Sequence, residues 1–414
     1  MRKMRDSGVE WVGAIPQDWQ LSKIGSLYTQ RNEKVSDKNY QPLSVTMQGI
    51  LPQLATAAKT DDGDNRKLVR VGDFAINSRS DRRGSCGISP LDGSVSLINI
   101  ILTPRTAMHP GYYNWLFHTT LFADEFYKWG HGIVADLWTT RWQEMKSITV
   151  PVPEYAEQER IAAFLDAECA EIDAVLEKTR ASIEEYKKLK QAVITQAVTK
   201  GVRGDRPMKD SGIEWIGDIP AEWDVLNLVA HTSMLTPMRD RPENLDGPIP
   251  WVRIEDFEGK YIESSKAGLG VSMKTVKEMN LKVYPVGTIL CTSSCIMGKC
   301  AIVSRELVSN QRFIGIIPDQ TTDKTYLYYL MTSNAERMNF LSTGALQANL
   351  SRSAFEHLKV QFPPYSEQQE IAAYLDDKCE KIDELILKKQ QYLTEIENYK
   401  KSLIYEYVTG KREV

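Results

Sequence analysis

The side chains with the most evident binding chemistry lie in one short polar loop. The segment Asn77-Ser78-Arg79-Ser80-Asp81-Arg82-Arg83-Gly84-Ser85 places three arginines within five residues. Arginine can chelate the two acceptors of guanine in the major groove of DNA, and asparagine or glutamine can do the same for adenine. The alternative is a solvated loop without a ligand. The candidate binding residues of the first half are Asn77, Ser78, Arg79, Arg82 and Arg83.

A second set of polar residues follows a similar apolar segment later in the chain. Thr292-Ser293-Ser294 ends KVYPVGTILCTSS, which parallels LVRVGDFAINSRS around Asn77. Basic and carboxamide side chains follow within twenty residues. The duplicated context favours a binding loop over a solvated one. The candidates of the second half are Ser293, Ser294, Lys299, Arg305, Asn310, Gln311 and Arg312.

Signatures of nucleotide chemistry are weak. Gly298-Lys299-Cys300 lacks the upstream glycine and the Ser/Thr of a phosphate-binding loop. Phe362-Pro363-Pro364-Tyr365 resembles the NPPY motif of amino-methyltransferases, but phenylalanine stands where that motif needs Asn or Asp. No Gly-x-Gly-x-x-Gly turn for S-adenosylmethionine or a dinucleotide is present. The sequence therefore predicts no catalytic residues.

Sequence patterns for a metal site are also weak. Asp246 with Glu258-Gly259-Lys260 loosely fits a nuclease pattern that is common by chance. Cys291, Cys295 and Cys300 form no paired CxxC and have no histidine nearby, and the five histidines are scattered. We expect no metal site.

Two pairs of repeated segments organise the chain. EQERIAAFLDAECAEID at 157–173 returns as EQQEIAAYLDDKCEKID at 367–383, and DSGVEWVGAIPQDW at 6–19 returns as DSGIEWIGDIPAEW at 210–223. Repeats of this length indicate two similar halves, each a globular part followed by a long helix. The repeated tryptophans and isoleucines are interpreted as anchors that dock the start of each domain on its core.

The predicted helices, 157–199 and 367–409, carry apolar residues at spacings of three, four and seven. At about 1.5 Å per residue each is roughly 65 Å long, and such a stripe needs a partner. We expect antiparallel pairing and a pseudo-twofold relation between the halves; the alternative is that each helix packs on its own domain. The stripes comprise Ile161, Leu165, Ile172, Val175, Ile183, Tyr186 and Val193, and Ile371, Leu375, Ile382, Leu385, Tyr392, Tyr399 and Leu403.

Between the repeats, short apolar runs broken by Gly, Asp, Asn and Ser predict β-strands and turns. Residues 111–129 and 324–341 each predict one helix with an aromatic face. The fold class is therefore mixed α/β (α+β), with an internal repeat. The expected domains are 1–155, a long helix over 156–202, 203–362, and a second long helix over 363–414.

Composition narrows the class of protein. The chain has 414 residues, 42% hydrophobic and 26% charged, with a net charge of −4. These values are typical of a globular protein. Because the chain is acidic overall, any surface that binds nucleic acid must be a local cluster of positive charge and not a property of the whole chain. No apolar run approaches the roughly 20 residues that span a membrane. We expect a cytoplasmic protein with reduced cysteines.

The repeated motifs resemble those of the specificity subunits of type I restriction-modification enzymes. The resemblance is carried by the two DSG-containing segments, by the Pro-rich lead into EQERIAAFLD and EQQEIAAYLD, and by the AVTKG and YVTGK endings. It covers essentially the whole chain. It implies that each globular part is a target-recognition domain for half of a split DNA sequence, and that the helices set the gap between the halves.

The resemblance also implies the partners. They are double-stranded DNA, two methyltransferase (M) subunits and the restriction or motor (R) subunits. No cofactor is expected on this subunit, since S-adenosylmethionine, ATP and Mg belong to the partners. Two alternatives stay open: a DNA nuclease or methyltransferase that acts by itself, and a protein scaffold without a role in DNA binding.

Overall fold

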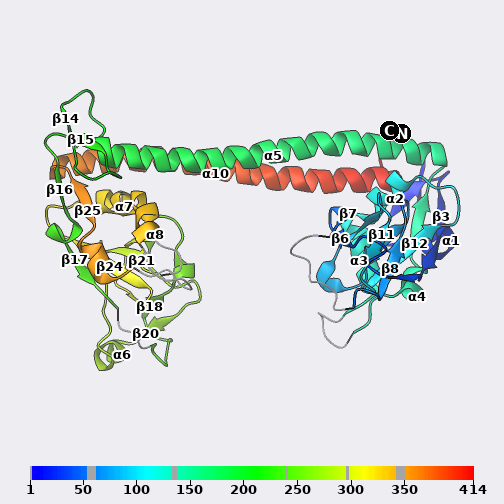
Figure 1. Ribbon diagram of the computed structural model, residues 1–414, viewed down its shortest axis with the longest axis horizontal. Helices are drawn as coiled ribbons and strands as arrows, with labels where there is room; N and C mark the ends of the chain where they lie inside the picture. The colour runs from blue at the N-terminus through cyan, green and yellow to red at the C-terminus, as the bar shows by residue number, and fades with distance from the viewer. Residues whose placement is uncertain (1, 54–61, 133–137, 238–240, 295–297, 342–349) are drawn as a thin grey trace. The chain divides into compact units, whose positions relative to one another are not determined.

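The computed structural model describes residues 2–53, 62–132, 138–237, 241–294, 298–341 and 350–414 (Figure 1). The chain divides into two compact units. Unit 1 comprises Met1–Arg180 and Gln390–Val414, and unit 2 comprises Ala181–Lys389. Each unit contains part of both long helices, α5 (Tyr155–Lys200) and α10 (Tyr365–Val408).

Unit 1 is built on short antiparallel strands. Its largest sheet has the order β10-β9-β12-β4, and a second has the order β11-β8-β5. The apolar runs around Phe74 and Ile100 become the two central strands, because both faces of that sheet are covered. The strands are β1 (Met4–Asp6), β2 (Ala14–Pro16), β3 (Gln20–Lys23), β4 (Tyr28–Arg31), β5 (Lys34–Val35), β6 (Leu43–Thr46), β7 (Gly49–Pro52), β8 (Arg66–Val69), β9 (Phe74–Asn77), β10 (Cys86–Ile88), β11 (Gly93–Val95), β12 (Asn99–Pro104) and β13 (Thr149–Val152).

Unit 2 repeats the plan with a five-stranded sheet of order β17-β24-β21-β22-β19, in which β19 and β22 are parallel. A smaller sheet has the order β20-β18-β23. The strands are β14 (Met208–Asp210), β15 (Asp218–Pro220), β16 (Asp224–Asn227), β17 (Thr232–Leu235), β18 (Ile249–Val252), β19 (Tyr261–Ile262), β20 (Gly270–Val271), β21 (Ile289–Thr292), β22 (Cys300–Val303), β23 (Val308–Ser309), β24 (Phe313–Pro318) and β25 (Lys359–Phe362).

The aromatic segments that were expected to form one helix each are broken in two. Thr119 separates α2 (Pro110–Phe117) from α3 (Thr120–Lys128), because its hydroxyl accepts from Phe122 N and caps the second helix. Asn334 stands at the same break between α7 (Lys324–Ser333) and α8 (Ala335–Leu341). The remaining helices are α1 (Ile24–Leu27), η1 (Ser80–Arg82), α4 (Trp142–Met145), η3 (Leu228–Ala230), η4 (Ile254–Asp256), α6 (Met273–Glu278) and α9 (Arg352–Glu356).

The long helices pair antiparallel within each unit. In unit 1 the rings of Phe164 and Tyr407 lie 4.4 Å apart, and Lys400 binds Asp173 at 2.6 Å. In unit 2 Lys190 binds Asp383 at 2.6 Å. The end of α10 also completes the core of unit 1 through Leu403, Ile404, Tyr407 and Val408.

The predicted apolar stripes were wrong at four positions. Val175, Leu385, Tyr392 and Tyr399 are exposed. On α5 the buried line continues instead through Cys169, Leu176, Thr179 and Ile183. With Ile172 between Cys169 and Leu176, these residues keep alternating steps of three and four along one seam, whereas Val175 lies one position off it.

The repeated Glu-Gln pair fastens each long helix to its unit. Gln158 accepts from His109 N at 2.9 Å and donates to Pro153 O; Gln368 accepts from Asp323 N at 2.8 Å and donates to Pro363 O. These carboxamides therefore tie the start of α5 to the start of α2, and the start of α10 to the start of α7.

The glutamates of the same pair hold the repeated tryptophans. Trp19 Nε1 donates to Glu157 and Trp223 Nε1 to Glu367, at 2.9 and 3.0 Å. An arginine completes each cluster. Arg2 binds Glu157 and lies over the Trp19 ring, and the hydrogen bond to Glu157 raises the pKa of Arg2. In unit 2 the second arginine, Arg206, binds Glu367 at 2.6 Å and lies over the Trp223 ring.

One tryptophan departs from the anchoring interpretation. Trp11 is 6% exposed and meets Phe122 edge-on, but its counterpart Trp215 is 42% exposed. Arg337 lies 3.8 Å from the centre of the Trp215 ring, whereas an aromatic side chain, Phe122, meets Trp11 in unit 1.

Within the described residues, no helix has an apolar stretch long enough to cross a lipid bilayer.

Candidate nucleic-acid interface

The basic loop of unit 1 begins where β9 ends. Asn77 N donates to Ser85 O at 2.9 Å, which closes the loop, and Asn77 Oδ1 accepts from Arg79 N. Ser78 Oγ donates to Ile98 O at 2.5 Å. Asn77 and Ser78 are both buried. Their side chains therefore hold the loop in place.

The three arginines diverge. Arg83 forms an ion pair with Asp124 on α3, and its guanidinium lies 5.9 Å from the centre of the Tyr127 ring. Arg82 is exposed, with Asp81 at 3.8 Å. Arg79 borders a cleft. The three arginines are close together in the sequence, but the turn of η1 (Ser80–Arg82) gives their side chains different surroundings.

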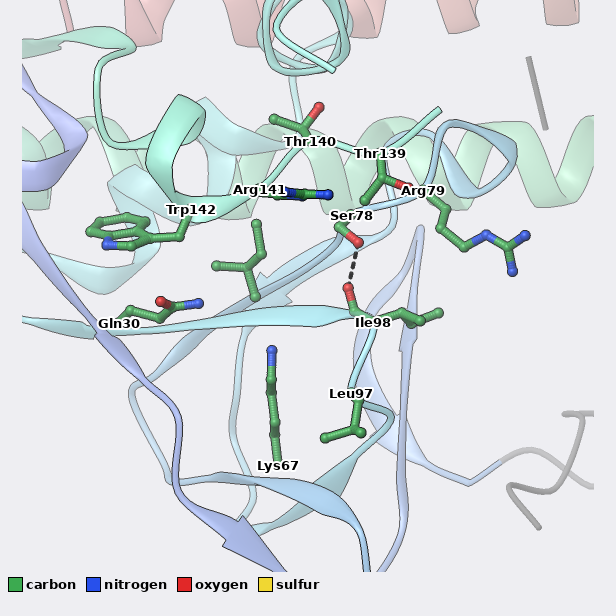
Figure 2. A pocket seen from close by; sticks show the side chains of 11 residues that line it. Gln30, Lys67, Ser78, Arg79, Leu97, Ile98, Thr139, Thr140, Arg141 and Trp142 are labelled. Atoms are coloured by element: carbon green, nitrogen blue, oxygen red, sulfur yellow. Dashed lines mark hydrogen bonds between the residues drawn. The ribbon is translucent and has the colours of Figure 1, made fainter. Parts of the chain in front are cut away.

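The cleft beside Arg79 has a volume of about 410 Å³ and is shown in Figure 2. Three of the described side chains that line it are cationic, and none of them is acidic. Exposed apolar side chains, Leu97 and Ile98, form part of its wall. The lining residues are Gln30, Lys67, Ser78, Arg79, Leu97, Ile98, Ile100, Thr139, Thr140, Arg141 and Trp142.

The backbone brings these distant residues together. Thr140 N donates to Ser78 O at 3.0 Å, and Arg79 and Thr139 form an isolated antiparallel bridge. Gln30 comes from β4 and Lys67 from β8. The segment ahead of α4 is therefore docked on the loop after β9, so that the basic groups of both surround one depression.

Two cations of the cleft, Lys67 and Arg141, form no ion pair with the described residues. Lys67 Nζ donates to the carbonyl of Asn99 at 2.6 Å, and burial lowers the pKa of Lys67. Arg141 is exposed and has no ion-pair partner among the described residues. Arg79 has a carboxylate of Asp81 at 3.7 Å. The cleft can therefore accept a negatively charged ligand.

The second candidate loop has the same backbone setting. Leu350 N donates to Ser293 O at 2.9 Å, as Thr140 N does to Ser78 O, and Ser293 N donates to Arg312 O at 2.8 Å. Ser293 and Ser294 therefore lie beside the Asn310–Arg312 turn. Gln311 and Arg312 are exposed there, whereas Asn310 Oδ1 accepts from Arg312 N and shapes the turn.

Two predicted residues of unit 2 lie at the margin of this group. Lys299 is joined to the loop through Thr292 N, which donates to Lys299 O, and its ammonium lies 5.8 Å from the centre of the Phe257 ring. Arg305 belongs to the turn between β22 and β23 and donates to Pro248 O. In the described part of the chain, Arg305 is bonded to Pro248 and not to the Ser293 loop.

Sequence reasoning missed Gln30, Lys67, Arg141 and Trp142. Thr139-Thr140-Arg141-Trp142 carried a signal, because it occupies the position of Asn349-Leu350-Ser351-Arg352 in the second half. Gln30 and Lys67 carried none, since each is a single polar residue in a strand.

The nuclease-like pattern finds other partners in the structure. Glu258 pairs with Lys266 at 2.5 Å, and Lys260 pairs with Asp376 on α10 at 2.5 Å. Tyr329 also donates to Asp376. Across the described residues, no group of three or more His, Cys, Asp or Glu side chains is arranged to hold a metal ion.

Comparison with known proteins shows which sequences the chain resembles. The sequence model of the type I restriction modification DNA specificity domain matches residues 224–398. The type I restriction enzyme MjaIX specificity subunit of Methanocaldococcus jannaschii is 36% identical over 176 residues, a match that spans 40% of each chain. The putative type I restriction enzyme MjaX specificity subunit of the same organism is 23% identical over 97% of this chain and 96% of its own length.

Solved structures share the fold. A chain from a study of complex assembly and conformational transition of the type I R-M system superposes with a TM-score of 0.77 over 96% of this chain and 99% of its own, at 13% identity. The HsdS subunit from Thermoanaerobacter tengcongensis superposes with a TM-score of 0.54 over 98% and 100%, at 15% identity.

The duplicated motifs, their structural roles and these matches agree. Residues 224–398 match the type I restriction modification DNA specificity domain, and nearly the whole chain is similar to specificity subunits of type I restriction enzymes.

Proposed function

We propose that unit 1 and unit 2 each read one half of a bipartite DNA target. The observation that carries this proposal is the duplicated construction of the candidate loops. In both units a polar loop leaves a central strand, β9 or β21, and is bonded to the segment ahead of a short helix, α4 or α9. Two readers of one construction and different side chains suit a target with two unlike halves.

The chemistry on DNA belongs to partner subunits in this proposal. Two methyltransferase subunits and restriction subunits assemble on the chain and carry S-adenosylmethionine, ATP and Mg. The chain is their non-catalytic specificity subunit. Methyl transfer to adenine and cleavage therefore need the assembled complex.

The long helices supply surfaces for these partners. In unit 1, Val175 on α5 and Tyr392 and Tyr399 on α10 are exposed. In unit 2, Leu189 on α5 and Leu385 and Leu387 on α10 are exposed as well. Large apolar side chains on otherwise charged helices are typical of docking surfaces. Part of the phosphate-neutralising surface comes from the partners, so this acidic chain alone binds DNA weakly.

Mapping methylated bases tests the proposal directly. The chain is co-expressed with its methyltransferase subunits in a host without adenine methylation, and modified adenines are mapped across the genome. A single split target, seen only when all subunits are present, is the expected result. Methylation or cleavage by the purified chain alone would favour the independent-enzyme alternative.

DNA binding gives a second test. The chain is titrated with the mapped target in the presence and absence of its methyltransferase subunits. Tight specific binding is expected only for the complex. Equal affinity for the isolated chain would contradict the shared-surface idea.

A further inference from the structure

We propose that the cleft of unit 1 binds a phosphate of the DNA backbone, with Lys67 and Arg141 as its cationic contacts. This inference rests on the proposed function and deepens it, because it separates the groups that position DNA from the groups that read its bases. Figure 2 shows Lys67 and Arg141 entering the cleft from opposite sides, whereas the side chain of Arg79 extends away from both.

Charge is the first argument. Lys67 is half-buried, and the hydrogen-bond acceptor that its ammonium finds in the described part of the chain is a neutral carbonyl, that of Asn99. A cation removed from water without a carboxylate partner favours an anion at the same place. Arg141 adds a second positive charge without an ion-pair partner among the described residues. Two such groups on one depression favour a phosphodiester, which carries a full negative charge.

Shape is the second argument. Lys67 lies recessed in a depression of about 410 Å³, and a ligand must reach inward to meet it. The phosphates form the convex ridges of duplex DNA, whereas base edges lie on the floors of the grooves. A phosphate on a ridge can therefore reach a recessed cation, whereas a base edge on the floor of a groove cannot. The apolar walls at Leu97, Ile98 and Trp142 can pack against the adjacent sugar.

Rigidity is the third argument. Thr140 is fully buried and its hydroxyl donates to Phe126 O at 2.9 Å, while Arg141 N donates to Glu144 Oε2 at 3.0 Å. The backbone that carries Arg141 is therefore fixed on both sides. Contacts from a fixed backbone position a ligand with little loss of conformational entropy.

The counterpart positions in unit 2 differ in part. Lys282 stands at the position of Lys67 and donates to Asn280 Oδ1 at 3.2 Å. Ser351 occupies the place of Arg141, and its hydroxyl accepts from Ala354 N to cap α9. Arg352 occupies the place of Trp142 and binds Glu356 at 2.7 Å. The pair of cations therefore belongs to unit 1, and its loss should be felt only in the half of the target that unit 1 reads.

The test uses the complete complex with methyltransferase subunits and the target mapped as above. Lys67→Met keeps the apolar stem of the side chain, and Arg141→Gln changes an exposed residue. Each is expected to weaken DNA binding roughly tenfold, the usual loss for one charge-assisted hydrogen bond. Each should also lower the salt dependence of log K by about one. The methylated sequence stays unchanged, and Lys23→Ala, an exposed charge of unit 1 outside the cleft, changes neither quantity.

Neutral backbone analogues locate the contact. A methylphosphonate is placed at one phosphate position at a time along the target. At one position in the unit 1 half-site, the analogue should weaken the wild type but add no further loss to Lys67→Met. Additive losses at every position would overturn the proposal, and so would a changed methylated sequence, which would make these residues base readers.

The proposed function and the phosphate contact can be disproved independently. If the wild-type complex yields no split target, the proposed function is wrong. If it yields one and both cleft variants bind it as tightly as the wild type, only the phosphate contact is wrong.

Discussion

Residues 96–98 of unit 1 and 310–312 of unit 2 occupy the same position, directly before a strand that pairs with the centre of the main sheet. Ile98 O accepts from Ser78 Oγ, and Arg312 O accepts from Ser293 N. The side chains differ completely: Ser96-Leu97-Ile98 in one unit, Asn310-Gln311-Arg312 in the other. The backbone of the loop is therefore kept while its outer surface changes from apolar to polar.

The contacts that attach each long helix to its unit are, by contrast, the same in both units. Trp115 Nε1 donates to Asp166 at 2.8 Å, and Tyr329 OH donates to Asp376 at 2.7 Å. The Glu-Gln pairs and their arginines repeat without change. Repeated polar contacts at the starts of α5 and α10 stabilise the same arrangement of elements in both units, so loop surfaces can change without altering that arrangement. In the proposed function, this allows the two units to read unlike half-sites.

The largest expected effect comes from lengthening both long helices. One heptad is inserted in the 157–199 segment after Arg180, and one in α10 after Lys389. Two helical turns add about 10.5 Å, which corresponds to roughly three base pairs. The mapped target should keep both half-sequences and gain that gap. Replacement of seven residues at the same points without insertion is the control, and an unaltered gap would contradict the spacing role.

Next in size is the loss of a buried carboxylate. Glu367 is 0% exposed, whereas the side chain of Glu157 is 14% exposed. Glu367→Gln should destabilise unit 2 by about 3 kcal/mol, since it leaves Arg206 buried beside a neutral group. Glu157→Gln should cost unit 1 less. Hydrogen exchange of the β14–β15 and β1–β2 hairpins measures both.

The exposed acids of the same clusters serve as controls. Asp18→Asn and Glu222→Gln remove partners of Arg2 and Arg206 that face solvent, and each should cost no more than about 1 kcal/mol. A larger loss for Glu157→Gln than for Glu367→Gln would show that burial does not set the difference between the units.

Base reading should divide by unit. Arg79→Ala should relax the half-site of unit 1, and Arg312→Ala that of unit 2, each by about 1–3 kcal/mol of discrimination at one base pair. Arg82→Ala and Arg83→Ala should have smaller effects, Arg83 because it is paired with Asp124. Methylation maps of the four variants give the answer. An unchanged sequence for all of them would favour another reading face.

The smallest effect concerns pH. His118 Nδ1 meets Asn114 O at 2.7 Å, and in unit 2 Thr332 Oγ1 donates to Tyr328 O at the same place. Burial lowers the pKa of His118. The unfolded chain therefore binds the proton first as pH falls below about 6.5, and the free energy of unfolding of unit 1 decreases there.

The slope cannot exceed about 1.4 kcal/mol per pH unit for one proton. His118→Thr, which copies unit 2, should remove this dependence between pH 7 and 5. Urea unfolding at several pH values measures it. An unchanged slope in the variant would assign the dependence to another group.

Much of the fold could be predicted from the sequence, because the sequence contains two copies of the same motifs. The repeats around Trp19 and Glu157 predicted two similar halves and two long helices, and the mixed α/β class is confirmed. The breaks at Thr119 and Asn334 were missed, since one polar side chain that bonds to the backbone at a helix end outweighs an otherwise continuous helical pattern. The seam of α5 was misassigned at Val175 because spacing alone does not distinguish neighbouring stripes.

The candidate loops were found from their composition, but the cleft was not. Lys67 and Arg141 are separated by 74 residues, and contacts such as the pairing of Ser78 with Thr140 bring them to one cleft. Contacts of this range depend on the whole sheet, and a single sequence gives no local sign of them.

The division of the chain has a consequence for its synthesis. Unit 2 is complete once Lys389 has been made, but the core of unit 1 includes Leu403 and Tyr407, and Tyr112 OH donates to Val408 O at 2.8 Å. On the ribosome the first domain begun is therefore the last to close. For the seconds needed to add its final segment, at about 5–20 residues per second, the apolar groove that receives α10 stays open to chaperones.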